Sequence, residues 1–292
     1  MSHLLAEIAS QPECWAKAIE LAAPAGPALP APGERVAVIG CGSSLNVARC
    51  YASLREAAGQ GETDAFPASE LPAARHYDHM VYVSRTGTTT EVLDALRRAP
   101  AGVRTTAIAA DPGSPLLQEA GAVVLLDFSA ERSVVSSRFI TSALVLLRAH
   151  LGEDLRALPD AAARELARPL PPGLAEHREF TFLGRGWAAA VADEAALKLR
   201  EASQTWAESY PALEFRHGPI SVADENTAVW GIGPIPASLA EDAARTGAKV
   251  VTADTDPLVS LLGAQRLAVA LAARKGINPD HPRSLSRSVI LA

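Results

Sequence analysis

A cluster of small hydroxyl side chains follows one apolar segment of the chain. The run MVYV ends at Val83 and leads directly into SRTGTTTE, residues 84–91, with five hydroxyl side chains and one Gly. A second turn, CGSS at 41–44, follows the apolar run VAVI in the same way. Hydroxyls donate hydrogen bonds, and glycines let backbone N–H groups come close to a ligand. Both turns are therefore candidates for binding an anion such as a phosphate monoester.

Four hydroxyls are the expected donors to such an anion, namely Ser44, Ser84, Thr86 and Thr89, with Arg85 as a further positive charge or a solvent-exposed side chain. Ser and Thr in such turns can also act only as helix caps, but capping needs fewer of them. The sequence has no GxGxxG or Walker pattern, so we expect no nucleotide cofactor. These turns therefore favour a monophosphate ligand over a nucleotide.

Lys198 and Glu201 are the candidate acid–base pair. They lie three residues apart in a stretch with helical character, so they share one face of that helix. A positioned carboxylate can move a proton between neighbouring carbons. The alternative is an ion pair on the surface of the helix, and the spacing alone favours that alternative.

Histidines supply a second candidate. His217 stands in EFRHGP, before a Gly-Pro turn. A lone loop histidine is more often structural, although the imidazole suits proton transfer near neutral pH. His76 and His79 have no evident third ligand nearby, so we expect no metal site.

Apolar strands alternate with helical stretches along the whole chain, which is typical of α/β proteins with a parallel sheet covered on both faces. We expect helices over 1–23, 45–58, 91–98, 134–150 and 151–178, and strands at the apolar runs that separate them. Ligands of such open sheets bind beyond the carboxyl ends of the strands. Both hydroxyl-bearing turns are at such ends.

The chain also carries an internal repeat. VAVIGCG at 36–42 returns as FTFLGRG at 180–186, VYVSRT at 81–86 as VWGIGP at 229–234, and TTAIAAD at 105–111 as AKVVTAD at 248–254. Each copy lies about 145 residues further along, which predicts two copies of one domain. The hydroxyls occur only in the first copy, so the fold alone does not require them.

Composition limits the function classes. The net charge of −6 and the lack of a basic cluster argue against nucleic-acid binding. No apolar stretch approaches the ~20 residues that span a bilayer, and the N-terminus has no signal-peptide pattern. The three cysteines form neither a disulfide nor a metal pattern. We expect a cytoplasmic protein.

Several motifs together resemble one family. CGSSLN at 41–46 and SRTGTTTE at 84–91 resemble the sugar isomerase (SIS) domain family of phosphosugar-binding proteins. ERSVVSSRF at 131–139, ALKLREAS at 196–203, AESYPALEFRHGP at 207–219 and NPDHPRSLSRSV at 278–289 are similar to the isomerase half of glucosamine-6-phosphate synthase. The resemblance implies two tandem SIS domains, each a doubly wound, mostly parallel sheet flanked by helices. We expect an N-terminal helix and Pro-rich linker over 1–34, the first domain over 35–165, and the second with an active-site tail over 166–292.

The resemblance also implies a role for individual residues. The phosphate ligands would be Gly42, Ser43, Ser44, Ser84, Arg85, Thr86 and Thr89, and the sugar would contact Cys41, Val134 and Ser136. Glu201 would move the proton between C1 and C2, with Lys198 one helical turn before it. His217 would reach the site of a neighbouring subunit and open the sugar ring, which implies a homodimer.

Three positions depart from the family pattern. Arg85 and Thr88 stand where the family has Gln and Glu, and Arg287 replaces a reactive lysine in the tail. Arginine stays protonated and does not form a Schiff base, so Arg287 would polarise a sugar oxygen instead. The 34 residues before the first domain are too few for the family's glutaminase domain, so we expect no channelled ammonia.

These features favour deamination and isomerisation of glucosamine 6-phosphate to fructose 6-phosphate. Several alternatives share the same initial proton abstraction: dehydration of N-acetylglucosamine 6-phosphate by loss of the C3 hydroxyl, plain ketose/aldose isomerisation, and release of an amine from a fructosyl-amine 6-phosphate. An alternative of another class is a phosphosugar sensor without turnover. The presence of Glu201, His217 and the tail favours an enzyme.

Overall fold

The computed structural model describes residues 2–291; residues 1 and 292, at the ends of the expected first and last segments, lie outside it. The chain divides into two compact units, each with its own sheet. The first-sheet unit comprises residues 10–132, 136–159 and the tail from Ser286, and the second-sheet unit comprises residues 2–9, 133–135 and 160–285.

The first sheet has five parallel strands in the order β2-β1-β3-β4-β5. Its strands are β1 (Val36–Gly40), β2 (Thr63–Pro67), β3 (His79–Val83), β4 (Arg104–Ala109) and β5 (Ala122–Leu125). Every residue of β1 and β3 is buried, as expected for parallel strands covered on both faces. The order places β2 on one side of β1 and β3 on the other. The strand order therefore reverses between β1 and β3, the usual ligand position in open α/β sheets.

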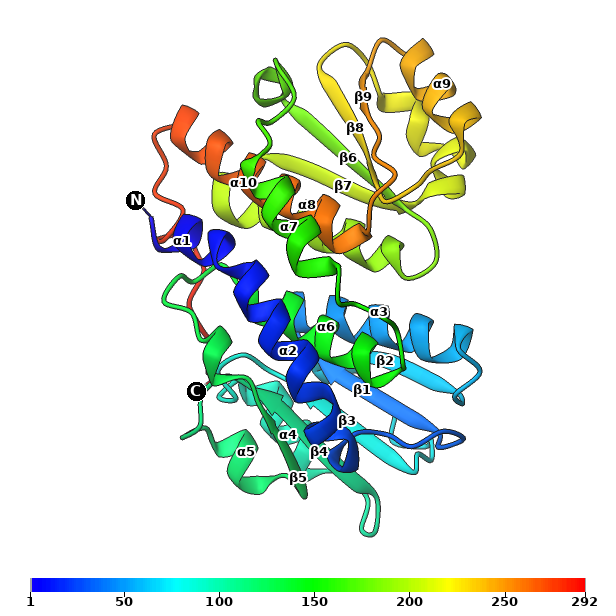
Figure 1. The fold of residues 1–292 in the computed structure, drawn as a ribbon, viewed down its shortest axis with the longest axis vertical. Coiled ribbons are helices and arrows are strands. Elements are labelled where there is room, and N and C mark those ends of the chain that lie inside the picture. Colours follow the sequence, from blue (N-terminus) through cyan, green and yellow to red (C-terminus); the bar gives the residue numbers. More distant parts are fainter. Residues whose placement is uncertain (1, 292) are drawn as a thin grey trace. The chain divides into compact units, whose positions relative to one another are not determined.

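Helices cover both faces of this sheet (Figure 1). They are α2 (Gln11–Ala25), α3 (Ser43–Ala57), α4 (Thr90–Arg97), α5 (Pro115–Glu119) and α6 (Arg138–His150). In Figure 1, α2, α3 and α6 lie on one face, and α4 and α5 lie on the other. The core beneath α4 joins Val92 and Leu96 of the helix to Ile39 and Tyr82 of the sheet. Burial of these apolar side chains fixes α4, and with it the loop before α4.

The second sheet has four parallel strands in the order β7-β6-β8-β9. They are β6 (Glu179–Gly184), β7 (Trp206–Pro211), β8 (Thr227–Ile232) and β9 (Lys249–Val251). The accompanying helices are α1 (His3–Ala9), α7 (Leu158–Ala167), which begins just before the division between the units, α8 (Ala188–Ser203), α9 (Ala237–Arg245) and α10 (Pro257–Arg274). Helices α8 and α10 pack together on one face of this sheet (Figure 1).

The strands of the sequence repeat occupy equivalent places in the two sheets. β1, β3 and β4 are ordered in the first sheet as β6, β8 and β9 are in the second. This order is what duplication of one domain requires, although the repeat itself stays a prediction.

Some boundaries differ from those expected. The helix expected over 1–23 is two helices that break at Ser10, and the helix expected from residue 134 begins only at Arg138. The stretch 151–178 contains α7 and a short 3-10 turn rather than one helix, because LPPG at 170–173 cannot continue it. Strands β2 and β7 were not expected, since TDAFP and WAESYP carry polar residues and Pro.

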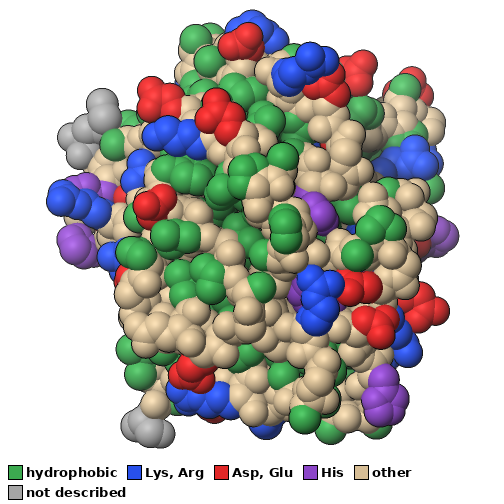
Figure 2. Space-filling model, turned by 60° about the horizontal axis from the view of Figure 1, so that its bottom comes forward, with side chains coloured by type: hydrophobic (Ala, Val, Ile, Leu, Met, Phe, Trp, Pro, Cys, Tyr) green, Lys and Arg blue, Asp and Glu red, His purple; other side chains and the backbone are tan. Residues whose placement is uncertain are grey.

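The surface mixes both signs of charge. On the face that Figure 2 presents, acidic and basic side chains alternate among uncharged atoms. None of the helices among residues 2–291 combines the length and apolar character needed to cross a bilayer.

Candidate active site

The hydroxyl loop, residues 84–90, lies beyond the carboxyl end of β3 and leads into α4. Ser84 accepts a hydrogen bond from Gly87 N (3.2 Å), which closes the loop on itself. Gly87 has a φ of +61°, and a Cβ there would collide with the Ser114 side chain. Only Gly therefore fits at this position.

The threonine hydroxyls of this loop are not used as helix caps. Thr89 is the residue before α4, but its side chain makes no capping hydrogen bond to that helix. Thr86 and Thr88 place their hydroxyl oxygens 2.9 Å apart. Capping of α4 by Thr89 therefore does not explain its hydroxyl.

The second turn, residues 41–44, lies beyond the carboxyl end of β1. Gly42 has a φ of +55° and precedes α3, and Ser44 N donates to the Cys41 carbonyl (3.1 Å). A Cβ on Gly40 would lie 2.6 Å from the Ser44 carbonyl carbon, so α3 begins directly against the strand. Because β1 and β3 are adjacent and parallel, the two turns stand at the same edge of the sheet.

Cys41 packs against the core beneath α4. Burial raises the pKa of its thiol, which favours the neutral form. The predicted ligands Gly42, Ser43 and Ser44 are thus brought to one sheet edge with Ser84, Thr86 and Thr89.

Arg85 is held by a carboxylate that the sequence did not single out. Its Nη1 lies 2.9 Å from Glu131 Oε2, and both side chains are buried. Glu131 also accepts from Ser136 Oγ (2.8 Å) and from the backbone N–H of Ser137 (2.6 Å). Burial alone would raise the pKa of Glu131, but the guanidinium of Arg85 and these hydrogen bonds lower it. The only sequence signal was an acidic residue inside ERSVVSSRF, next to positions expected to line the sugar.

The tail, residues 286–291, lies on the hydroxyl loop. The Ser288 hydroxyl is 2.9 Å from Thr88 Oγ1, 3.3 Å from Thr86 Oγ1 and 3.4 Å from Thr89 Oγ1. Arg85 Nη2 donates to the carbonyl of Arg287 (3.0 Å). Arg287 itself is exposed. Arg287 of the tail and Arg85 of the hydroxyl loop are therefore in contact, through the backbone carbonyl of Arg287 rather than its side chain.

The second-sheet unit contains the predicted acid–base pair. Lys198 and Glu201 stand on α8, and Lys198 Nζ lies 2.6 Å from Glu201 Oε2 and 3.2 Å from Glu194 Oε1. The Lys198 side chain is only 2% exposed, whereas that of Glu201 is 21% exposed. Burial alone would lower the pKa of Lys198, but Glu194 and Glu201 together raise it, so the ammonium stays charged. The i,i+3 ion pair does form, but its lysine is buried, so it is not the surface ion pair that the spacing favoured.

The remaining predicted residues are placed separately. His217 ends a short 3-10 helix (Ala212–His217) and is exposed. Val134 is half-buried in the second-sheet unit, and Ser136 is half-buried in the first-sheet unit, where it bonds to Glu131.

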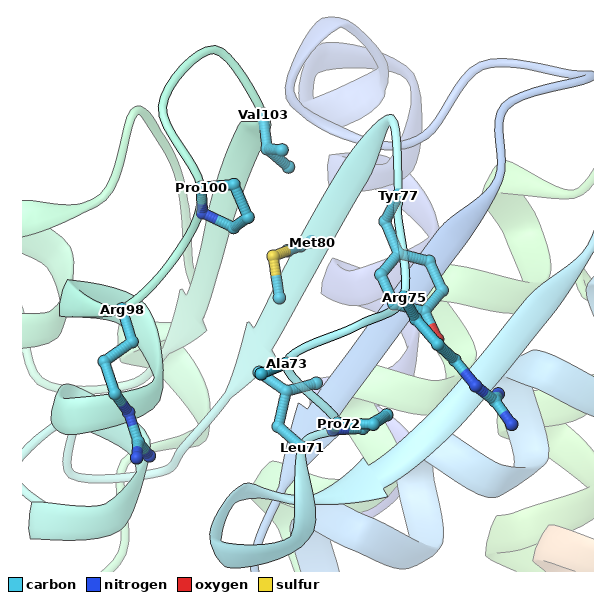
Figure 3. Close-up of a pocket in the computed structure, with 9 residues that line it drawn as sticks. All are labelled: Leu71, Pro72, Ala73, Arg75, Tyr77, Met80, Arg98, Pro100 and Val103. Atoms are coloured by element: carbon cyan, nitrogen blue, oxygen red, sulfur yellow. The ribbon is translucent and has the colours of Figure 1, made fainter.

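A separate pocket of about 140 Å³ lies near the amino-terminal ends of β3 and β4 (Figure 3). Its wall is mostly apolar, with Met80 at the centre and the stems of Arg75 and Arg98 on either side. None of the predicted site residues lines it. It is at the opposite end of the strands from the hydroxyl loop.

Known proteins resemble this chain in sequence. Residues 173–255 match the family model of the SIS domain. The isomerizing glutamine–fructose-6-phosphate aminotransferase of Thermus thermophilus is 30% identical, over 88% of this chain and 52% of the relative. That of Methanothermobacter thermautotrophicus is 27% identical, over 88% of this chain and 51% of the relative. The chain thus spans about half the length of the curated relatives it matches.

Solved structures resemble it over the full length. The glucosamine-6-phosphate deaminase from Thermotoga maritima has a TM-score of 0.84 and 27% identity, covering 99% of this chain and 100% of that one. The tagatose-6-phosphate ketose/aldose isomerase from Escherichia coli has a TM-score of 0.80 at 18% identity, covering 97% and 98%, which shows the fold alone. The chain is a member of the SIS domain family. Within that family its relatives include the isomerizing aminotransferases, as the motifs predicted.

Proposed function

We propose that the chain converts glucosamine 6-phosphate and water to fructose 6-phosphate and ammonia, using two tandem SIS domains. One observation favours an enzyme over a sensor. The buried ammonium of Lys198 holds the partly exposed carboxylate of Glu201 at 2.6 Å. A phosphate-binding protein without turnover has no need of a carboxylate fixed in this way. The likeness to a glucosamine-6-phosphate deaminase, over 99% of this chain and 100% of that one, supports this reaction.

Phosphate binding is assigned to the edge of the first sheet. The hydroxyls of Ser44, Ser84, Thr86 and Thr89 donate to the phosphate oxygens, as do backbone N–H groups at the starts of α3 and α4. Arg85 supports the loop through Glu131 and adds positive charge nearby. The sugar contacts Cys41, Val134 and Ser136.

Proton transfer is assigned to Glu201. In the open-chain aldehyde, its carboxylate takes the proton from C2, the C2–H electrons form C1=C2, and the C1=O electrons move to O1, which takes up a proton from water. The Glu201 carboxylic acid then returns its proton to C1 as the nitrogen lone pair forms C2=N and the nitrogen releases a proton to water. The product is a C2 imine, which water hydrolyses to the ketose and ammonia. Lys198 orients the carboxylate throughout. His217, contributed by the partner subunit of a homodimer, moves the proton between O1 and O5 during ring opening, and Arg287 stabilises charge on the sugar oxygen.

The test is ammonia release from glucosamine 6-phosphate by the wild type and Glu201→Gln. Exposed Glu225, in a turn of the second-sheet unit, provides the matched control Glu225→Gln. Release by the wild type and the control, lost in Glu201→Gln, supports the proposal. If N-acetylglucosamine 6-phosphate or a ketose phosphate reacts instead, the proposal is wrong in its substrate. Binding of these sugar phosphates without any turnover would favour the alternative function, a phosphosugar sensor.

A further inference from the structure

The pocket near the amino-terminal ends of β3 and β4 has the size of a single ring (Figure 3). Its volume is about 140 Å³, and apolar side chains form most of its wall, among them Leu71, Met80, Pro100 and Val103. For comparison, an apolar cavity of about 150 Å³ in another protein binds benzene. The pocket therefore has room for one aromatic ring.

The wall of this pocket is held in place from behind. Met80 is buried in the first sheet, and the Tyr82 hydroxyl donates to its sulfur (3.6 Å). Tyr77 is also buried, and its hydroxyl donates to Asp64 Oδ2 (2.7 Å). The cavity exists with both side chains fixed in this way, so the pocket is preformed. The thioether of Met80 makes favourable contacts with aromatic rings, which favours an aromatic ligand over an aliphatic one.

The charged side chains at the pocket are two arginines, and none of the described residues that line it is Asp or Glu. Arg75 is already paired, because its Nη1 lies 2.8 Å from Asp64 Oδ2. Arg98 is exposed, and its Nε donates to the backbone carbonyl of Asp94 (3.1 Å). Within residues 2–291, the Arg98 guanidinium forms no ion pair. An unpaired guanidinium beside an apolar pocket favours a ligand that carries a carboxylate.

We propose that this pocket binds a small aromatic carboxylate, with the ring against Met80 and the carboxylate on Arg98. The pocket and the hydroxyl loop stand at opposite ends of β3, so this ligand and a phosphosugar do not compete for the same space. A ligand bound there is a regulator rather than a substrate. Its binding does not depend on the proposed function.

Two probes test the chemical class of the ligand. Phenylacetate and its uncharged counterpart, phenylacetamide, are titrated into the purified full chain and followed by ligand-observed NMR. The wild type should bind phenylacetate saturably and about tenfold more tightly than phenylacetamide, because a hydrogen bond between ions is stronger than one to a neutral group. Absence of saturable phenylacetate binding, or equal affinities for the two probes, overturns the inference.

Two variants test the place of the ligand. Arg98→Gln should bind phenylacetate no more tightly than phenylacetamide. The control Arg97→Gln removes the same charge from a side chain that pairs with Glu119 outside the pocket, and it should match the wild type. Ala73→Leu, which fills the cavity from an exposed loop, should abolish saturable phenylacetate binding, and Ala74→Leu, next to it but not in the wall, should not. An unchanged affinity in either Arg98→Gln or Ala73→Leu overturns the inference.

Competition separates this pocket from the proposed active site. Saturating glucose 6-phosphate should leave the affinity for phenylacetate unchanged, whereas displacement of phenylacetate would place the probe at the hydroxyl loop and overturn the inference. If the chain does not turn over glucosamine 6-phosphate but binds phenylacetate through Arg98, the proposed function fails and the pocket assignment stands.

Discussion

Arg85 and Glu131 form a buried ion pair, with 2.9 Å between Nη1 and Oε2, in the first-sheet unit. The pair joins the loop after β3 to the segment before α6. It also gives a physical reason why arginine is tolerated in the loop that we propose as the phosphate site. The guanidinium is turned toward a carboxylate and a backbone carbonyl, and our proposal leaves the direct contacts with phosphate to the neighbouring hydroxyls.

The ion pair predicts how stability depends on pH. The pKa of Glu131 in the folded chain is below its usual value of 4.5. The unfolded chain therefore binds the proton first, and the carboxylate contributes its full stability above pH ~4.5 and loses it as pH falls through the folded pKa. Urea unfolding at several pH values should show the wild type more stable than Glu131→Gln at pH 7, with a narrowing gap below ~4.5. A gap independent of pH contradicts this.

Removing Lys198 should destabilise the second-sheet unit. Lys198→Met leaves buried Glu194 without its cation, and breaking a buried pair in this way costs about 3–5 kcal/mol in the free energy of unfolding. Lys198→Met combined with Glu194→Gln should be more stable than Lys198→Met alone, because the buried charge is gone. Additive losses in a double-mutant cycle would show that Lys198 and Glu194 are not coupled.

Gly87→Ala should affect both stability and binding. A side chain at φ +61° is strained and also meets Ser114, so the loss in the free energy of unfolding is about 1–3 kcal/mol. Gly102→Ala is the matched control, since its φ is +87° but nothing lies within 4 Å of the added Cβ. Urea unfolding should rank Gly87→Ala as the more destabilised, with weaker glucose 6-phosphate binding. Equal losses would mean that the contact with Ser114 is unimportant.

Thr89→Val should separate binding from folding. Because the Thr89 hydroxyl does not cap α4, its removal should leave the free energy of unfolding within about 0.5 kcal/mol of the wild type. The affinity for glucose 6-phosphate should fall by about 0.5–1.5 kcal/mol, the net value of one hydrogen bond. Calorimetric titration beside urea unfolding checks both. A stability loss without an affinity loss would make Thr89 a structural residue.

The sequence predicts well what depends on local patterns. The continuous apolar runs at 36–39 and 80–83 are buried strands, and the two hydroxyl-bearing turns stand at one sheet edge because β1 and β3 are neighbours. The helix that carries Lys198 and Glu201 is also present as α8.

What the sequence does not predict depends on contacts between distant residues. Arg85 finds its partner 46 positions away, and the tail reaches a loop about 200 positions earlier in the chain. The start of α6 at Arg138 has the same origin, because Glu131 captures the N–H groups of Ser137 and Phe139. Lys198 is buried on a helix that packs against α10, β6 and β7, and an i,i+3 spacing does not reveal this tertiary burial.

The central claim is that this chain is an enzyme with Glu201 as its base. The direct measurement is the rate of ammonia release from glucosamine 6-phosphate by the purified wild type, Glu201→Gln and Glu225→Gln. We predict release by the wild type and Glu225→Gln, and a loss of at least about 100-fold in Glu201→Gln, the usual contribution of a positioned base. Equal rates in all three, or no release by the wild type when glucosamine 6-phosphate binds, would contradict the account.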